Sequence, residues 1–285
     1  MAFKKHRNKI SNAVKVAQLS PFRYPGGKSW LVPEIRRWLS SSKIAPKIFI
    51  EPFAGGGIAS LIVTYEGLAN SAYMGEIDQD VASVWISILN SSDEDVSWLC
   101  KKILEFNVTL DNVQKIINGK PRSIKAKAFR TIIKNRMHRG GILAPGSGLL
   151  KAGESNKGLH SRWYPETLVK RISIIRKIKR KIVFKNIDAF DLIQRFSHKP
   201  NAFYFIDPPY TIGGKRAGKR LYSHNEVDHD ILFQKLASVT GSVMLTYDDS
   251  PEVRALARRY KFKIKSISMM NSHNATMREL IILKP

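Results

Sequence analysis

Short apolar runs alternate along this chain with longer stretches in which apolar residues recur at helical spacing. The runs predict strands at residues 47–51, 72–75, 181–184, 202–206, 242–247, 262–268 and 279–283. The helical spacing predicts helices near residues 58–66, 80–89, 165–178, 188–196 and 229–239. Strands that alternate with helices favour an α/β fold with a mostly parallel sheet whose faces are covered. The last two strands, joined by a polar loop, are expected to form an antiparallel hairpin at the edge of this sheet.

The middle of the chain interrupts this alternation with a strongly basic segment. Residues 101–181 hold 21 Lys and Arg against 4 acids, and so supply +17 of the net charge of +25. Several glycines between residues 140 and 158 predict a mobile loop within it. One sign of charge concentrated in one segment, with aromatic residues between the arginines, favours binding of nucleic acid. We therefore predict a mainly helical insertion at 96–164 in a larger domain formed by residues 19–95 and 165–285.

Other features of the composition narrow the class of protein. We expect residues 1–18 to form a basic arm that either touches phosphates of a bound nucleic acid or has no role. No stretch reaches the roughly 18 apolar residues of a spanning helix, so no membrane partner is expected. Cys100 is the only cysteine, which excludes an internal disulfide and a cysteine-based zinc cluster and fits a reducing cytosol. The histidines have no metal-like spacing, so no metal site is predicted.

Two glycine clusters raise the question of a nucleotide site. Residues 25–29 resemble the end of a phosphate-binding loop, but Phe22 stands where such a loop needs a glycine. No apolar strand leads into them either, so a nucleoside triphosphatase is excluded. The three glycines at 55–57 stand where a predicted strand opens into a helix, although Ser60 replaces the last glycine of a dinucleotide-binding turn. Because Glu76 follows at the tip of the next strand, where an acid commonly holds ribose hydroxyls, this cluster predicts a pocket for an adenosine-type cofactor.

The most informative residues are Asp207, Pro208, Pro209 and Tyr210, which directly follow the apolar run at 202–206. Prolines cannot donate to a sheet ladder and fix φ, so the carbonyls of Asp207 and Pro208 are expected to point out of the fold. An acid, a free carbonyl and an aromatic face held rigidly together suit a flat heterocycle that is gripped by its exocyclic amine. The alternative is an ordinary turn at the end of a strand.

Together these motifs resemble the Dam-type (D12 class) family of site-specific DNA adenine-N6 methyltransferases. The resemblance runs from Pro21 nearly to the C-terminus, and four motifs carry it in the family's order, at residues 22–28, 49–57, 76–78 and 207–210. It implies a Rossmann-like methyltransferase sheet, with the larger domain as the catalytic domain and the insertion as a target-recognition domain. It also implies S-adenosyl-L-methionine as the cofactor and double-stranded DNA as the partner.

The same resemblance assigns a cofactor site. Its residues are Tyr24, Pro25, Gly26, Gly27, Lys28, Glu51, Pro52, Phe53, Ala54, Gly55, Gly56, Glu76, Ile77, Asp188 and Ala189. Among them, Glu76 takes the ribose hydroxyls and Asp188 meets the cofactor's adenine amine. Asp191 is a competing assignment for that acid, and helix capping is a competing explanation.

The resemblance also assigns catalytic and DNA-binding residues. Hydrogen bonds from adenine N6–H to the Asp207 carboxylate and the Pro208 carbonyl would return electron density to the nitrogen, with Pro209 in the same rigid segment. Tyr210 would stack on the target base, which must be flipped out of the duplex. Residues of the insertion are expected to read bases or contact phosphates, namely Arg130, Lys134, Asn135, Arg136, His138, Arg139 and Arg162.

Three alternatives stay open at this point. An N4-cytosine DNA methyltransferase is the nearest, since it also methylates an exocyclic amine, but such enzymes more often carry Ser in place of Asp207. RNA as the substrate and a catalytically silent DNA-binding homologue are further alternatives. We expect a monomer in the cytoplasm, associated with the nucleoid, and leave open a cognate restriction endonuclease as a partner.

Overall fold

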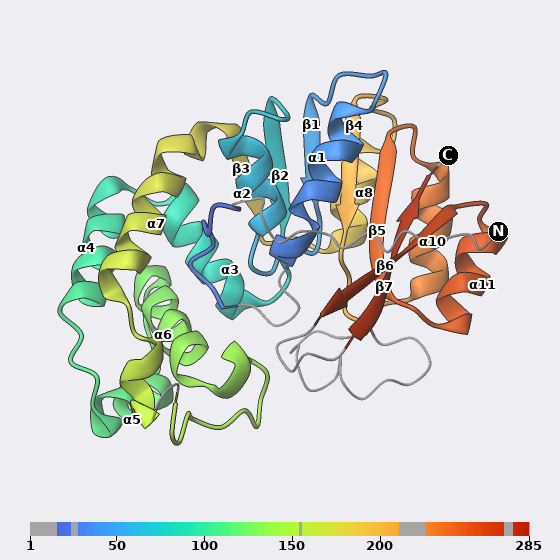
Figure 1. Cartoon of the computed structure of the whole chain (residues 1–285). Coiled ribbons are helices and arrows are strands. Elements are labelled where there is room, and N and C mark those ends of the chain that lie inside the picture. The colour runs from blue at the N-terminus through green and yellow to red at the C-terminus, as the bar shows by residue number, and fades with distance from the viewer. Residues whose placement is uncertain (1–15, 24–27, 154–155, 211–225, 271–275, 285) are drawn as a thin grey trace, which may run out of the picture.

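The computed structural model describes residues 16–23, 28–153, 156–210, 226–270 and 276–284 (Figure 1). Within these ranges seven strands form one sheet in the order β3-β2-β1-β4-β5-β7-β6. The strands are β1 (Ile48–Glu51), β2 (Ser71–Gly75), β3 (Ile182–Lys185), β4 (Ala202–Ile206), β5 (Ser242–Asp248), β6 (Lys263–Met270) and β7 (Thr276–Leu283).

The sheet is parallel from β3 to β5, and β7 runs antiparallel between β5 and β6. The predicted α/β fold, a mostly parallel sheet with an antiparallel hairpin at one edge, is therefore confirmed. The order of the strands reverses between β1 and β4, which are neighbours in the sheet although they lie far apart in the sequence. In open α/β sheets a ligand binds outside the carboxyl ends of the strands at such a reversal.

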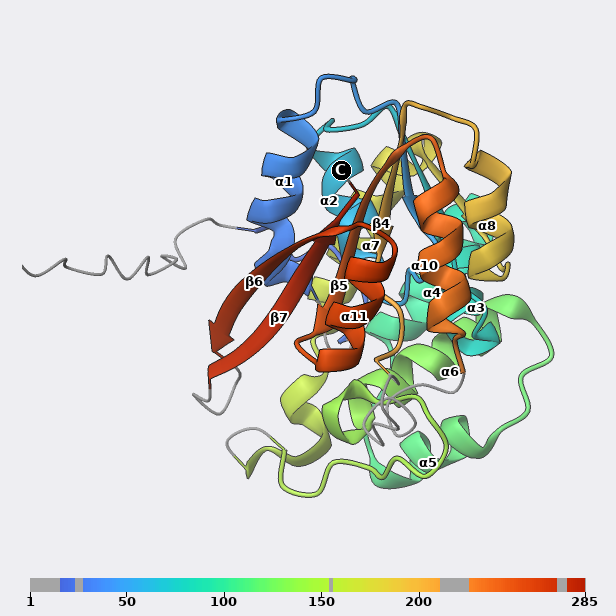
Figure 2. The same cartoon turned by 90° about the vertical axis from the view of Figure 1, so that its right-hand side faces the viewer.

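Helices cover both faces of the sheet (Figures 1 and 2). One face is covered by α1 (Val32–Ser40), which follows a 3₁₀ turn at Lys28–Leu31, and by α2 (Ile58–Tyr65). The other face is covered by α8 (Ala189–Phe196), α10 (His229–Ser238) and α11 (Pro251–Arg259). The residues of the central strand β4 are all buried, because both of its faces are covered.

A third group of helices lies beyond β3, on the left of Figure 1. It comprises α3 (Gln79–Trp85), a π-helical turn (Ile86–Asn90), α4 (Asp93–Leu104), α5 (Leu110–Asn118), α6 (Ile124–Met137) and α7 (Pro165–Ile178). Short 3₁₀ turns lie at Arg139–Gly141, Gly158–Arg162 and Lys179–Lys181. The predicted helix at 80–89 is thus an α-helix that widens into a π-helical turn. No helix in the described ranges is long and apolar enough to cross a bilayer.

Two helices were absent from the sequence prediction. In α11 only Val253 and Ala257 are buried, so the apolar stripe is too short to give a helical signal. The other is α1, which buries Val32, Ile35 and Leu39 but follows directly on the glycine-containing segment at 25–29.

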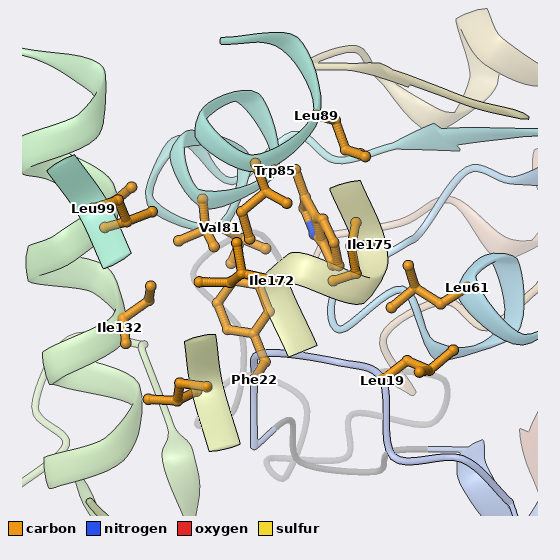
Figure 3. Packing of buried hydrophobic residues seen from close by; sticks show 14 of the residues in the cluster. Leu19, Phe22, Leu61, Val81, Trp85, Leu89, Leu99, Ile132, Ile172 and Ile175 are labelled. Atoms are coloured by element: carbon orange, nitrogen blue, oxygen red, sulfur yellow. The ribbon is translucent and has the colours of Figure 1, made fainter. Parts of the chain in front are cut away.

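The third group of helices shares one hydrophobic core with the sheet. Figure 3 shows Trp85 of α3 among Phe22, Ile172 and Ile175, with Ile132 of α6 nearby. The Trp85 ring lies 5.8 Å from the Phe22 ring and 6.5 Å from that of Phe184 in β3, measured between centroids. Because apolar burial is the main favourable contribution to folding, the basic segment and the sheet should unfold together.

We predict that Ile132→Ala lowers the free energy of unfolding by about 2 to 4 kcal/mol, because Ile132 is 1% exposed within this shared core. Ile124→Ala is the matched control on the same helix; its side chain is 46% exposed, so the change should stay within about 0.5 kcal/mol. Urea unfolding followed by circular dichroism and by tryptophan fluorescence measures both. Two separate transitions in the wild-type protein would contradict a shared core.

Candidate functional site

A cavity of about 800 Å³ lies at the carboxyl ends of β1, β2 and β4, where the strand order reverses. Its volume is that of a small-molecule site. The residues assigned from the sequence that line it are Lys28, Glu51, Pro52, Phe53, Ala54, Gly55, Gly56, Glu76, Ile77, Asp188, Ala189, Asp207 and Pro209, together with Arg136. Pro208 and Tyr210 do not line it, and Tyr24, Pro25, Gly26 and Gly27 lie outside the described residues.

The turn after β1 depends on glycine for a steric reason. Gly57 has a φ of +62°, and a Cβ at this position would lie 2.5 Å from Met74 Cε and 2.9 Å from the Trp85 ring. The indole Nε1 of Trp85 donates a hydrogen bond of 2.9 Å to the Gly55 carbonyl. Trp85 and Met74 therefore hold the backbone of the turn on one side, and its other side forms part of the cavity wall.

Two buried glutamates fix this turn and the start of the helix that follows it. Glu51 accepts a 2.8 Å hydrogen bond from the Ser60 amide. Glu76 accepts bonds of 2.9 Å from the amides of Gly55 and Asp78, one on each carboxylate oxygen. Burial raises the pKa of both Glu51 and Glu76 to about 7. Both side chains line the cavity, so each can also meet a ligand there.

Asp188 and Asp191, the two candidates for the acid that meets the cofactor's adenine amine, differ in position. Asp188 accepts a 2.8 Å hydrogen bond from the Phe190 amide and so caps α8, and it also lines the cavity. Asp191 is exposed one turn further along and is not part of the cavity wall. Capping and a place in the cavity thus belong to the same residue, Asp188.

Asp207 is held through one of its two carboxylate oxygens. Its Oδ1 accepts hydrogen bonds from the Thr246 hydroxyl at 2.7 Å and from the Tyr210 hydroxyl at 2.9 Å. The Lys28 ammonium lies 3.3 Å from the same oxygen. Three donors on Oδ1 fix the orientation of the carboxylate and leave Oδ2 available to another donor.

Lys28 stands between two acids instead of only lining a cofactor pocket. Its ammonium is 3.5 Å from Glu279 of β7 as well as 3.3 Å from Asp207, and its side chain is 5% exposed. Burial lowers the pKa of Lys28, but the charges of Asp207 and Glu279 outweigh burial, and the pKa is raised. Burial also raises the pKa of Glu279 to about 7. A charged lysine therefore sits beside Asp207.

The Tyr210 ring stacks on Tyr247, with the centroids 5.5 Å apart and the planes 23° apart. Burial raises the pKa of the Tyr210 hydroxyl, which keeps it protonated as the donor to Asp207. Stacking of Tyr210 on a substrate base stays a prediction.

The residues predicted to bind DNA fall into different environments. Asn135 is 1% exposed; its amide donates to the carbonyls of Arg23 and Gly141 and accepts from the Arg23 amide. Arg136 is 5% exposed and donates to the Pro21 carbonyl. His138 is also buried, with Ser147 Oγ 2.6 Å from its Nδ1. The side chains of these three residues are buried and bound within the protein. Their contacts with DNA stay a prediction.

Asp80 of α3 binds two of the other predicted residues. Its carboxylate oxygens lie 3.1 Å from Arg130 and 3.4 Å from Lys134. Arg139 is exposed at the start of the glycine-containing loop, and Arg162 is half-buried, with Nη1 3.4 Å from the His138 carbonyl. Arg139 is therefore the residue of this predicted set whose position best suits contact with a large ligand.

Three residues at the site were missed from the sequence as members of it. Thr246 belongs to β5, whose Leu245 pairs with Ile206 of β4, so the end of β5 lies beside Asp207. The other two are Glu279 of β7, which lies 3.5 Å from Lys28, and Arg171 of α7, which lines the cavity. Adjacent ends of parallel strands meet at one edge, so the position of Thr246 was open to prediction once β5 followed β4.

The buried Glu51 should make stability depend on pH. Its folded pKa of about 7 lies above the ordinary value of 4.5, so the unfolded chain ionises first as the pH rises. We predict that Glu51→Gln gains stability relative to wild type between pH 4.5 and 7, by about 1.4 kcal/mol for each pKa unit of difference. Urea unfolding across this range measures it, with Glu105→Gln at an exposed glutamate as control. Parallel curves for wild type and Glu51→Gln would contradict the raised pKa.

Comparison with known proteins supports the sequence resemblance. Residues 24–118, a third of the chain, match the family described as D12 class N6 adenine-specific DNA methyltransferase. The matched range contains Lys28, the turn after β1 and Glu76. No curated protein matches the chain.

Solved structures with a similar arrangement include a candidate RNA methyltransferase from Pyrococcus horikoshii. It is 11% identical, with 91% of this chain and 84% of that chain covered and a TM-score of 0.41. Another is the rRNA methyltransferase aviRa from Streptomyces viridochromogenes, 15% identical, with 89% and 83% covered and a TM-score of 0.40. Over residues 24–118 this chain is similar to the D12 class of N6 adenine-specific DNA methyltransferases, and this match supports an S-adenosylmethionine-dependent methyltransferase.

Proposed function

We propose that this protein transfers a methyl group from S-adenosylmethionine to the N6 amine of an adenine flipped out of a specific duplex DNA sequence. The observation that carries the proposal is the way in which the Asp207 carboxylate is held. Three donors from Lys28, Thr246 and Tyr210 fix its Oδ1, while Asp207 itself lines the cavity that the turn after β1 also lines.

The residues of the cavity fit an adenosine-type cofactor. Each oxygen of Glu76 accepts one backbone amide and keeps a lone pair for a ribose hydroxyl. Asp188 also lines the cavity, where its carboxylate can accept a hydrogen bond from the adenine amine of the cofactor. When bound, the cofactor supplies a methyl group on a positively charged sulfur. By resemblance, Tyr24, Pro25, Gly26 and Gly27 complete the site on the methionine side.

The chemical difficulty lies in the substrate amine. Its lone pair is delocalised into the ring, so N6 is a poor nucleophile. Acceptance of N6–H by Asp207 Oδ2 and by the Pro208 carbonyl favours a more tetrahedral nitrogen and stabilises the positive charge that develops on it. The three donors on Oδ1 hold the plane of the Asp207 carboxylate in place. The proton that N6 releases goes to Asp207 or to water.

The basic segment supplies the route to DNA. We propose that residues 96–164 form the target-recognition domain inserted into the catalytic domain of residues 19–95 and 165–285. The amine of a paired adenine cannot reach the walls of this cavity, so the base has to leave the stack. Lys and Arg on the surface of the segment contact phosphates, which gives affinity without sequence choice.

We predict that Asp207→Asn lowers methyl transfer from labelled cofactor to duplex DNA by at least about a hundredfold, because the variant loses a charged acceptor at the reacting nitrogen. Binding of S-adenosylhomocysteine, measured by calorimetry, should change by less than about threefold, since the proposed contacts of Asp207 are with the base. Asp191→Asn, at the exposed acid of α8, is the control and should transfer normally.

Near wild-type transfer by Asp207→Asn would refute the catalytic role of this residue. Label found on cytosine N4 would show that the adenine assignment is wrong and that the nearest alternative is right.

For DNA binding, we predict that Arg139→Gln raises the Kd for duplex DNA by about threefold to tenfold and lowers the salt slope of binding by about one. Arg139 is exposed beside the glycine-containing loop, whereas Arg195, at the last turn of α8, lies at the opposite end of the sheet. Arg195→Gln is therefore the matched control. Equal Kd values and equal salt slopes for the two variants in a fluorescence titration would place Arg139 outside the DNA interface.

A further inference from the structure

Two arginines from different helices lie against the wall of the cavity next to the turn after β1. Arg136 of α6 donates a 2.5 Å hydrogen bond to the Pro21 carbonyl, and Arg171 of α7 donates one of 2.8 Å to the Ser20 carbonyl. The Ser20 hydroxyl in turn donates a 2.6 Å bond to the Gly56 carbonyl. All of these residues except Pro21 line the cavity. Arg171 is thus linked through Ser20 to the turn after β1, and Arg136 binds the residue next to Ser20.

Arg136 is a buried cation without a matching anion among the described residues. It is 5% exposed, its Nε has no hydrogen-bond partner, and it forms no ion pair with a described carboxylate. The pKa of Arg136 is lowered to about 9, first by burial and then by the charges of Arg171, Arg23 and Arg162. Burial of a charge costs free energy unless the charge is paired and hydrogen bonded. We therefore expect an anionic group of a bound ligand to pair with Arg136.

The distribution of charge along the cavity indicates which ligand group this is. Glu51, Glu76 and Asp207 line its wall along the ends of the strands, while Arg136 and Arg171 line it on the side of the helices. The cofactor is cationic at its sulfur and its amine, and its carboxylate is its one anionic group. A phosphate of a duplex would stay on the outside of the protein, whereas a group that pairs with Arg136 has to enter the cavity.

We propose that Arg136 and Arg171 bind the carboxylate at the methionine end of the cofactor. This inference rests on the proposed function and changes one of its sequence-based assignments, because Arg136 becomes a cofactor residue instead of a DNA-reading residue. Charged N–H donors on a carboxylate form the stronger class of hydrogen bond. The Pro21 and Ser20 carbonyls take one donor from each guanidinium and hold the two groups in place for the ligand.

The assignment ties the basic segment to the cofactor site. Asn135, next to Arg136, binds the backbone of Arg23 and Gly141, so α6 fixes the chain at the start of the motif at residues 22–28. The helix that carries Arg136 is also attached to α3 through Asp80 and Arg130. The carboxylate of a bound cofactor would therefore neutralise positive charge where the recognition segment meets the sheet.

Calorimetry with two ligands tests the inference. One ligand is S-adenosylhomocysteine; the other is its decarboxylated analogue, S-adenosyl-3-thiopropylamine, which keeps the nucleoside and the amine. We expect Arg136→Gln and Arg171→Gln each to raise the Kd of S-adenosylhomocysteine by about tenfold to a hundredfold. The same variants should change the Kd of the analogue by less than about threefold, because the lost contact is absent from that complex.

Two further variants make the outcome decisive. Lys170→Gln, an exposed charge beside Arg171, is the control and should bind both ligands as wild type does. Arg136→Lys keeps the charge and should restore part of the affinity for S-adenosylhomocysteine, which separates a ligand contact from a folding defect. Equal weakening of both ligands, or no weakening of either, would refute the inference.

The remaining outcomes are also distinguishable. If wild-type protein binds neither ligand, the proposed function itself fails. If the arginine variants bind both ligands normally but lose affinity for duplex DNA measured without cofactor, the pair is a phosphate site and the inference is wrong.

Discussion

The structure depends on the parallel pairing of β1 with β4, which brings Glu51 and Asp207 to one edge of the sheet from distant parts of the sequence. This edge collects acids where the helices on both faces exclude water, and buried carboxylates must find donors inside the protein. The donors are supplied locally. The Ser60 amide donates to Glu51, and the amides of Gly55 and Asp78 donate to Glu76. Asp207 has its donors in Lys28, Thr246 and Tyr210. The site is therefore rigid, because the segments that form its walls also donate the hydrogen bonds to its carboxylates.

The basic segment has two roles that its composition alone does not separate. Part of its charge is used inside the protein: Arg130 and Lys134 surround Asp80, and Arg176 donates to the carbonyls of Ile88 and Ser91. The shared core around Trp85 attaches the same helices to the sheet. What remains on the surface, including Arg139, is available to a polyanion. The net charge of +17 on residues 101–181 is therefore larger than the charge that their surface presents to a polyanion. It also does not show that the same helices share a hydrophobic core with the sheet.

The sequence predicted the parts of the fold and of the site that have a local signal. Apolar runs and helical spacing located all seven described strands, and the glycines at 55–57 together with Glu76 located the cavity. Contacts between distant segments carry no such signal. The approach of Lys28 to Glu279, of Thr246 to Asp207 and of Arg136 to Pro21 follows from the strand order and from the docking of α6. For this reason arginines that look alike in the sequence divide into buried, paired and exposed residues only in three dimensions.

We propose that the rigid acceptor at Asp207 binds the amine of an adenine in DNA. Its most direct test is base-resolved detection of modified positions in the DNA of a methylation-free host that expresses this protein. We expect N6-methyladenine at one recurring sequence and none in a host that expresses no added protein. Methylation confined to cytosine N4, or found in RNA and absent from DNA, would contradict it.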